Sequence, residues 1–96
     1  MPRAIVLNTS DNVATLIDNG SAADACTLQG EAGHTVTLAT DIPFGHKVCI
    51  RELATGAEVV KYGQVIGRAS RAVRIGEHVH THNVEAARGR GDQPGR

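Results

Sequence analysis

The sequence has almost no aromatic residues: Phe44 and Tyr62 are the only two, tryptophan is absent, and aromatic residues make up 2% of the chain. A core without aromatic rings must be built from valine, isoleucine, leucine and alanine, which each remove less apolar surface from water. With 96 residues, the chain has material for one modest core. We therefore expect a single small domain that gains stability by packing against a partner surface.

Long apolar runs, an excess of one charge and cysteine motifs are missing as well. No apolar run approaches membrane-spanning length, and residues 4–7 are too few for the apolar region of a secretion signal. Ten basic residues balance ten acidic ones, so the basic stripe of a nucleic-acid-binding protein is not expected. Cys26 and Cys49 form no CxxC motif, which predicts reduced thiols in the core. We expect a cytoplasmic protein that binds neither nucleic acid nor membrane.

The apolar residues recur with the spacing of β-strands. Residues 34–40 alternate apolar and polar side chains, and so do residues 47–51, which predicts half-buried strands. No window has the apolar stripe of a helix, and one helical turn at residues 22–26 is the most that we expect. The predicted fold class is therefore mostly β, a compact domain with short strands and irregular loops. Further strands are predicted at residues 4–7, 13–17, 58–61 and 64–69, with a loop at residues 18–24.

The end of the chain has a different composition. From residue 86 it reads AARGRGDQPGR, with small and charged residues and no apolar anchor. Such a segment cannot bury enough apolar surface to fold. We predict a folded domain over residues 1–85 and a disordered tail over residues 86–96.

Three of the five histidines lie at every second position of the segment GEHVHTHN: His78, His80 and His82. If residues 78–84 are extended, the three imidazoles point to one side, and the outer two start roughly 13 Å apart. Metal–nitrogen bonds are about 2.0–2.1 Å long, so two neighbouring histidines can reach one ion but all three cannot. A further ligand must come from elsewhere in this chain, from a partner, or from substrate and water.

His46 is the best internal candidate for that ligand because it follows a turn glycine, and His34 is a weaker one. Solvated histidines on an edge strand are the structural alternative. Glu77, the carboxylate next to the segment, faces away by the same alternation, which argues against a complete metal site. Lys47 and Lys61 are the only lysines, and each can hold a carboxylate or an oxyanion, although exposed strand-end lysines are commoner.

Four motifs taken together resemble one family. They are DNVA at residues 11–14, IPFGHKVCI at 42–50, VVKYGQVIGRA at 59–69 and GEHVHTHNVE at 76–85. In this order and spacing the chain resembles the small subunit of the altronate dehydratase family, a SAF-type β-clip domain. In galactarate dehydratase, a similar sequence forms one segment of a single long chain. The small subunit of (2R)-sulfolactate sulfo-lyase is a close relative.

The resemblance implies part of a two-component lyase that dehydrates a sugar acid of the altronate type to a 2-keto-3-deoxy acid. It also implies a large catalytic subunit as partner and a shared divalent metal, Fe²⁺ or Mn²⁺. The alternative functions are sulfite release from (2R)-sulfolactate and carbohydrate binding without catalysis. Without its partner, the chain is expected to be able to form homo-oligomers. The implied catalytic residues are His46, His80 and His82, the substrate contacts are Lys47, Lys61 and Asn83, and the metal ligands are His78, His80 and His82.

Overall fold

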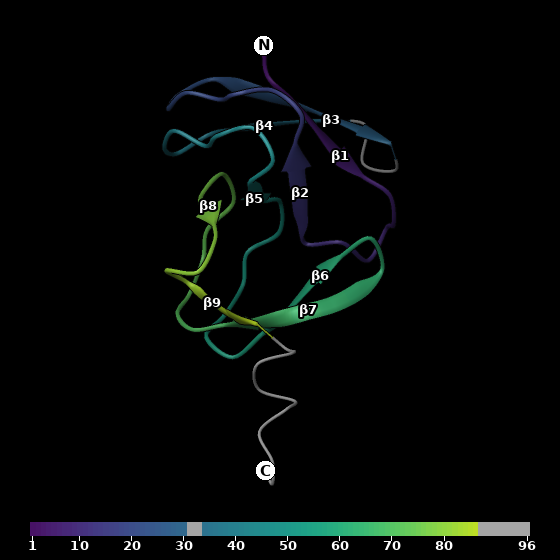
Figure 1. The fold of residues 1–96 in the computed structure, drawn as a ribbon, viewed down its shortest axis with the longest axis vertical. Helices are drawn as coiled ribbons and strands as arrows, with labels where there is room; N and C mark the ends of the chain where they lie inside the picture. The colour runs from purple at the N-terminus through teal and green to yellow at the C-terminus, as the bar shows by residue number, and fades with distance from the viewer. Residues whose placement is uncertain (31–33, 87–96) are drawn as a thin grey trace, which may run out of the picture.

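The computed structural model describes residues 1–30 and 34–86, which form a six-stranded sheet and a three-stranded sheet. The strand order is β4-β3-β1-β2-β5-β8 in the larger sheet and β6-β7-β9 in the smaller one. Figure 1 shows the smaller sheet below the larger one, on the side where the chain ends. The strands are β1 (Arg3–Val6), β2 (Val13–Leu16), β3 (Ala25–Gly30), β4 (Thr35–Thr37), β5 (Lys47–Cys49), β6 (Glu58–Lys61), β7 (Gln64–Ala69), β8 (His78–Val79) and β9 (Val84–Ala86).

The predicted mostly-β class is confirmed, because the described residues contain strands, turns and loops and no helix. No helix that could span a membrane occurs among them. The helical turn expected at residues 22–26 is wrong, since β3 begins at Ala25 and pairs with both β1 and β4. Strand β9 ends at Ala86, the first residue of the predicted tail, and residues 87–96 lie outside the described part.

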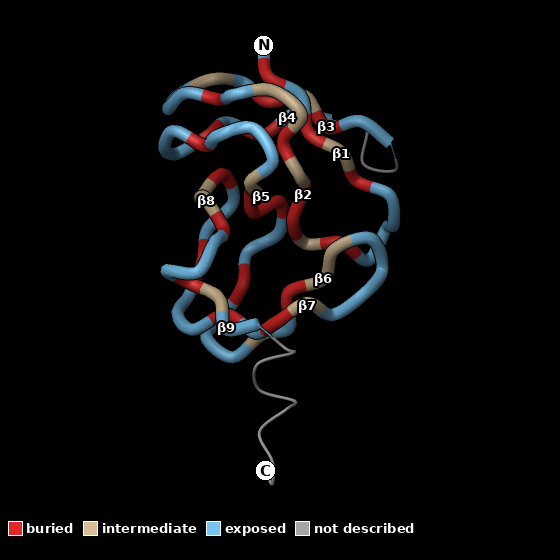
Figure 2. Tube along the Cα trace, viewed as in Figure 1, coloured by how far each residue is buried: buried red, intermediate tan, exposed pale blue. Residues whose placement is uncertain are grey.

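Two apolar cores lie on opposite faces of β2 and β5. Side chains alternate between the faces of a strand, so Ala14, Leu16 and Val48 enter the first core, whereas Val13 and Cys49 enter the second. Figure 2 shows the buried segments following both sheets. As predicted, neither core contains an aromatic ring. The first core also holds Ala4, Val6, Cys26, Leu28, Val36, Leu38, Ile42 and Ile50, and the second holds Leu53, Val59, Ala69, Val73 and Val79.

Asp11 and Asn12 join the larger sheet to the β6–β7 hairpin. The buried Asp11 carboxylate accepts hydrogen bonds from the backbone N–H of Asn8 at 3.2 Å and of Gly63 at 2.8 Å. The Asn12 amide donates to the carbonyl of Glu58 at 2.8 Å and accepts from the N–H of Val60 at 2.7 Å. The DNVA motif therefore has a structural explanation, because its first two side chains fix the hairpin to the larger sheet.

Replacing Asn12 by alanine removes both side-chain hydrogen bonds to the hairpin. We expect the free energy of unfolding to fall by about 1–3 kcal/mol, since two backbone groups lose their partners. Urea unfolding followed by circular dichroism measures this change. Asn12→Asp keeps the acceptor for Val60 and loses the donor to Glu58, so it serves as the matched control with a smaller loss. An alanine variant as stable as the wild type would show that apolar packing alone holds the hairpin.

Both cysteines are free and buried, in agreement with the predicted reduced core thiols. Burial raises the pKa of Cys49 to about 11, and the charges of Glu77 and Glu52 add to the shift. Burial also raises the pKa of Cys26. Because the folded state disfavours both thiolates, the stability that the thiols contribute is fully present below the unfolded pKa near 9 and is lost as the pH rises beyond it.

We therefore expect the unfolding midpoint to decrease between pH 9 and pH 11. We also expect iodoacetamide at pH 8 to alkylate the folded protein far more slowly than the urea-unfolded chain. Mass spectrometry of the labelled protein measures the rates, and Cys49→Ala identifies the contribution of that thiol. Equal rates for the folded and the unfolded chain would contradict the burial of the two side chains.

Candidate functional site

The histidine segment forms a turn instead of the extended strand that its alternation predicts. Strand β8 ends at Val79, and β9 begins at Val84 after a turn over residues 80–83. Asn83 closes this turn: its Oδ1 accepts from the N–H of His80 at 3.0 Å, and its Nδ2 donates to the carbonyl of His78 at 2.8 Å. The expectation that His78 and His82 start roughly 13 Å apart is therefore wrong, because the turn brings the chain back.

Four of the five imidazoles lie together as a result. The ring centroids of His78 and His82 are 5.3 Å apart, and those of His78 and His80 are 5.5 Å apart. His46 enters from the turn before β5, stacks on His80 at 4.5 Å and places its Nδ1 2.9 Å from Nε2 of His78. We call these four residues the histidine cluster. His46, predicted as the best internal partner, belongs to it.

The backbone around His46 explains how it reaches the cluster. Its carbonyl accepts from the N–H of Leu16 at 2.9 Å, and its N–H donates to the carbonyl of Pro43 at 3.0 Å. Gly45 takes a φ of +87°, a left-handed conformation that favours glycine. The turn thus ends beside β2, and β5 carries the imidazole toward β8.

Lys47 lies on the other face of β5. Lys47 pairs with Val79 across β5 and β8, whereas the neighbouring Val48 pairs with His78. Lys47 and Val79 therefore share the face that carries the second core. Burial lowers the pKa of Lys47, and the charge of Lys61 lowers it further.

A shallow hollow of about 230 Å³ lies at the end of β8. Lys47 and His80 line it together, so the exposed member of the stacked His46–His80 pair faces the same space as the lysine. Its other lining residues are mostly apolar, as suits a site that binds the carbon chain of a small molecule. They are Ile66, Val79, Thr81, Val84 and Ala86.

A second hollow of about 170 Å³ lies on the other side of the cluster. His78 and His82 border it, and Arg71, which the sequence analysis did not identify, borders it as well. Arg71 is brought there by a backbone hydrogen bond from Ser70 N–H to the carbonyl of Asn83, at 2.9 Å. No local sequence pattern predicts such a contact. The remaining lining residues are Ala39, Thr40, Glu77 and Asn83.

The histidine cluster lacks a carboxylate partner within the described residues. The two ion pairs found there, Arg3–Asp18 and Arg68–Glu58, involve none of the four histidines. Glu77 borders the second hollow, although the alternation predicts that it faces away; its Oε1 accepts from the backbone N–H of Arg74 at 3.0 Å. Burial lowers the pKa of His78, and the charges of His46, His82 and His80 add to the effect. The His78 imidazole is thus favoured in its neutral form.

The donor set fits part of a metal site. In the described ranges no group of three histidine, cysteine, aspartate or glutamate side chains is arranged to hold an ion. The 2.9 Å between His46 Nδ1 and His78 Nε2 is nevertheless near the ~3 Å that separates two adjacent nitrogens at about 2.0–2.1 Å from one ion. Imidazole ligands suit iron better than manganese, which prefers oxygen. The pair therefore fits two ligands of an iron site whose other ligands come from elsewhere.

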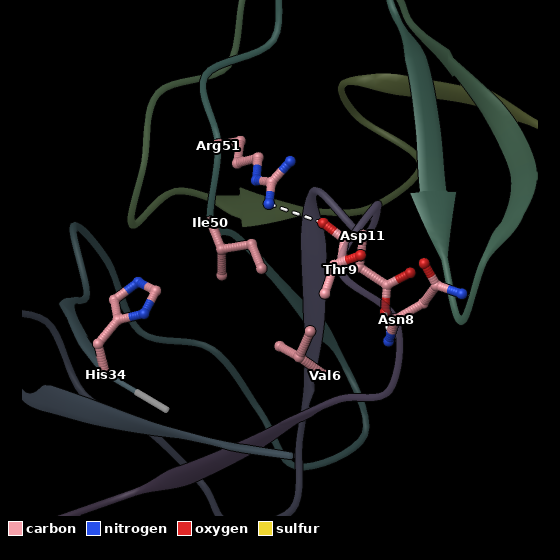
Figure 3. A pocket seen from close by; sticks show the side chains of 7 residues that line it. All are labelled: Val6, Asn8, Thr9, Asp11, His34, Ile50 and Arg51. Carbon is pink, nitrogen blue, oxygen red and sulfur yellow. Dashed lines mark hydrogen bonds between the residues drawn. The ribbon is translucent and has the colours of Figure 1, made fainter. Parts of the chain in front are cut away.

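A third hollow lies away from the cluster and contains His34, the fifth histidine (Figure 3). Arg51 reaches across its rim and donates to the carbonyl of Thr9 at 2.7 Å. The hollow also borders Asn8 and Asp11, whose side chains bond to the backbone nearby. His34 is therefore separate from the candidate site, consistent with its weaker standing in the sequence analysis.

Comparison with known proteins agrees with the resemblance to the altronate dehydratase family. Residues 2–87 match the altronate/galactarate dehydratase SAF domain family. Subunit alpha of the (2R)-sulfolactate sulfo-lyase of Chromohalobacter salexigens is 53% identical over 47 residues, which are 49% of this chain and 50% of that subunit. The corresponding subunit of Paracoccus pantotrophus is 43% identical over 53 residues, 55% of this chain and 79% of that subunit.

Altronate dehydratase of Escherichia coli is 36% identical over 80 residues, which are 83% of this chain and 16% of the enzyme. The match thus covers half of the Chromohalobacter subunit and a small part of the dehydratase.

Asn83→Ala removes both hydrogen bonds that close the turn between β8 and β9. We expect the free energy of unfolding to fall by about 2–3 kcal/mol, because buried backbone groups lose their partners. We also expect weaker nuclear Overhauser effects between the rings of His78 and His82. Thr81→Ala, in the exposed part of the same turn, is the matched control and should change stability by less than about 0.5 kcal/mol. If the two variants behave alike, the Asn83 side chain does not shape the turn.

Proposed function

Because the chain belongs to the altronate/galactarate dehydratase SAF domain family, we propose that it is the histidine-bearing part of a lyase that dehydrates an altronate-type sugar acid. The product is a 2-keto-3-deoxy acid. The observation that carries this proposal is the histidine cluster, in which four imidazoles lie within ring contact of one another without a carboxylate partner in the described residues. Imidazoles serve as bases, proton carriers or metal ligands.

In the proposed reaction, a base removes the proton from the carbon next to the substrate carboxylate. The hydroxyl group on the following carbon then takes up a proton and leaves as water, and the resulting enol becomes the 2-keto acid. His80 is the proposed base because it is exposed and shares a hollow with Lys47. His46 stacks on it at 4.5 Å and thereby fixes the orientation of the His80 ring. His82, on the other side of the cluster, is the proposed acid for the leaving hydroxyl group.

The lysines are suited to hold the negative charge of the substrate. Lys47 is half-buried and contacts the apolar lining of the first hollow, where water screens its charge less than at the surface. Lys61 lies near enough for its charge to lower the pKa of Lys47. The two ammonium groups repel each other, and an anion bound between them relieves this repulsion. Asn83 is proposed to act through the turn, since its amide already bonds to His78 and His80.

A divalent metal is part of the proposal. Its candidate ligands are His46 and His78, whose nitrogens lie 2.9 Å apart, while His80 and His82 keep the roles of base and acid. When bound, Fe²⁺ or Mn²⁺ stabilises the negative charge that develops on the substrate carboxylate as the proton leaves. The lowered pKa of His78 keeps its imidazole in the neutral form that binds metals. The missing oxygen ligands have to come from substrate, water or a second protein component.

A large catalytic component is the proposed partner. Two sulfo-lyase relatives are named as alpha subunits, and in altronate dehydratase of Escherichia coli the matched region is 16% of the chain. Both facts support a site completed by further protein. The hollows beside the cluster are open and shallow, which suits a surface that another component covers.

Sulfite elimination is the second candidate function. The observation that favours it is the 53% identity to the sulfo-lyase subunit of Chromohalobacter salexigens, although that match covers half of each chain. The proton that leaves and the role of the imidazoles are the same in both reactions, and the leaving group is sulfite instead of water. The chain alone therefore supports both substrates, and the proposed chemistry at the histidine cluster holds for either.

His80→Ala tests the proposal in the enzyme assembled with its large component. We expect turnover to fall by about 10²–10⁴-fold, because a general base is lost, while circular dichroism of the chain stays unchanged since His80 is exposed. Release of 2-keto acid and of sulfite is measured with altronate and with (2R)-sulfolactate. His34→Ala, outside the cluster, is the matched control. Full activity of the His80 variant would overturn the catalytic role and favour a carbohydrate-binding domain without catalysis.

A further inference from the structure

The second hollow lies between Arg71 and the histidines at positions 78 and 82, and the proposed reaction leaves Arg71 without a function. It has a volume of about 170 Å³ and opens on the side of the cluster away from Lys47. Its polar lining residues are Arg71, His78, His82, Thr40, Asn83 and Glu77. Since Asn83 and Glu77 already bond to nearby backbone groups, the groups left to meet a ligand are mainly cationic or neutral donors.

The backbone holds Arg71 at this place from both sides. On one side, Ser70 N–H donates to the carbonyl of Asn83 at 2.9 Å. On the other, Val73 and Leu53 exchange two backbone hydrogen bonds of 2.9 Å each. Only one residue separates Arg71 from Val73, so its Cα has little freedom to move away from the histidine turn. The guanidinium group is exposed and borders the hollow.

Arg71 has no hydrogen bond or ion pair to any residue in the ranges 1–30 and 34–86. The carboxylate nearest in the hollow, that of Glu77, accepts from the backbone N–H of Arg74 at 3.0 Å. Other arginines are used differently: Arg3 binds Asp18 at 2.8 Å, and Arg51 donates to Thr9. The guanidinium of Arg71 therefore offers a planar pair of donors beside the cluster, and such a pair binds a carboxylate or sulfonate group.

We propose that Arg71 binds a second anionic group of the substrate, at the end opposite the carboxylate that Lys47 holds. The inference rests on the proposed function and deepens it, because it gives Arg71 a role in substrate selection: a sugar acid with a carboxylate at each end gains a contact that altronate, with one carboxylate, does not make. Cations flank the histidines on both sides, Lys47 in the first hollow and Arg71 in the second. A substrate spanning the cluster places its reacting carbons at the imidazoles and its two charges at these cations.

Arg71→Gln in the assembled enzyme tests this assignment. The substrates compared are galactarate, which carries a carboxylate at each end, and altronate, which carries one carboxylate. We expect the variant to raise KM for the dianionic substrate by about 10–100-fold and to change kcat by less than about threefold, because the lost contact lies away from the reacting atoms. KM for a monoanionic substrate should stay unchanged. Arg71→Lys should restore part of the affinity.

Arg74→Gln is the matched control, because Arg74 is an exposed arginine three residues away whose side chain does not line the hollow. Equal effects on substrates with one and two charges, or no effect on either, would overturn the role of Arg71. Loss of assembly with the large component would also overturn it, since the guanidinium would then pair with a carboxylate of that component.

A binding measurement on the full chain separates this inference from the proposed function. Malonate, a small dianion, is titrated while nuclear magnetic resonance follows the Arg71 side-chain N–H and the ring protons of His82. We expect saturable shifts in the wild type and in Arg74→Gln, and their loss in Arg71→Gln. Such binding without any lyase activity would reject the proposed function and keep the anion site. Absence of saturable shifts in the wild type would reject the anion site itself.

Discussion

The arrangement of this domain depends on the hydrogen bonds that Asp11 and Asn12 make to the β6–β7 hairpin. The apolar core between the two sheets is small and contains no aromatic ring, and apolar contact is non-directional. Packing alone would therefore leave the hairpin free to shift along the larger sheet. Hydrogen bonds require a defined distance and direction, and an unmade one inside the protein costs free energy. They select one position of the hairpin.

That position also decides where Lys61 lies. Val60 and Gly63, on either side of Lys61 and Tyr62, are held by Asn12 and Asp11. The lysine is thus carried by one sheet and fixed by side chains of the other, at a point where its charge reaches Lys47. A motif that precedes the first predicted functional residue by more than thirty positions therefore contributes to the geometry of the site without touching it.

Much of the fold follows from the alternation of apolar residues, and the site does not. The strands around Val36 and Val48 were predictable because their apolar and polar residues alternate, and the strand around Val59 because Gly56 and Gly63 flank it. Strand β3 was missed, since its partner β1 lies in parallel and more than twenty residues away, which local patterns do not encode. His80 and His82 illustrate a second limit: spacing by two fits a strand and a turn equally well, and the Asn83 amide decides for the turn.

Although the net charge is zero, the acidic and the basic side chains differ in their partners. Asp11 bonds to backbone N–H groups, Asp18 and Glu58 pair with arginines, and Glu77 closes a turn. These acids are committed to the structure of the domain, whereas the Lys47 ammonium and the Arg71 guanidinium border open hollows beside imidazoles. Burial lowers the pKa values of Lys47 and His78, and neighbouring cationic or protonatable groups lower them further, which raises the energy of the charged form of each side chain. An anionic ligand lowers that energy, so the arrangement that weakens the isolated domain is the one that strengthens its complex with an acid.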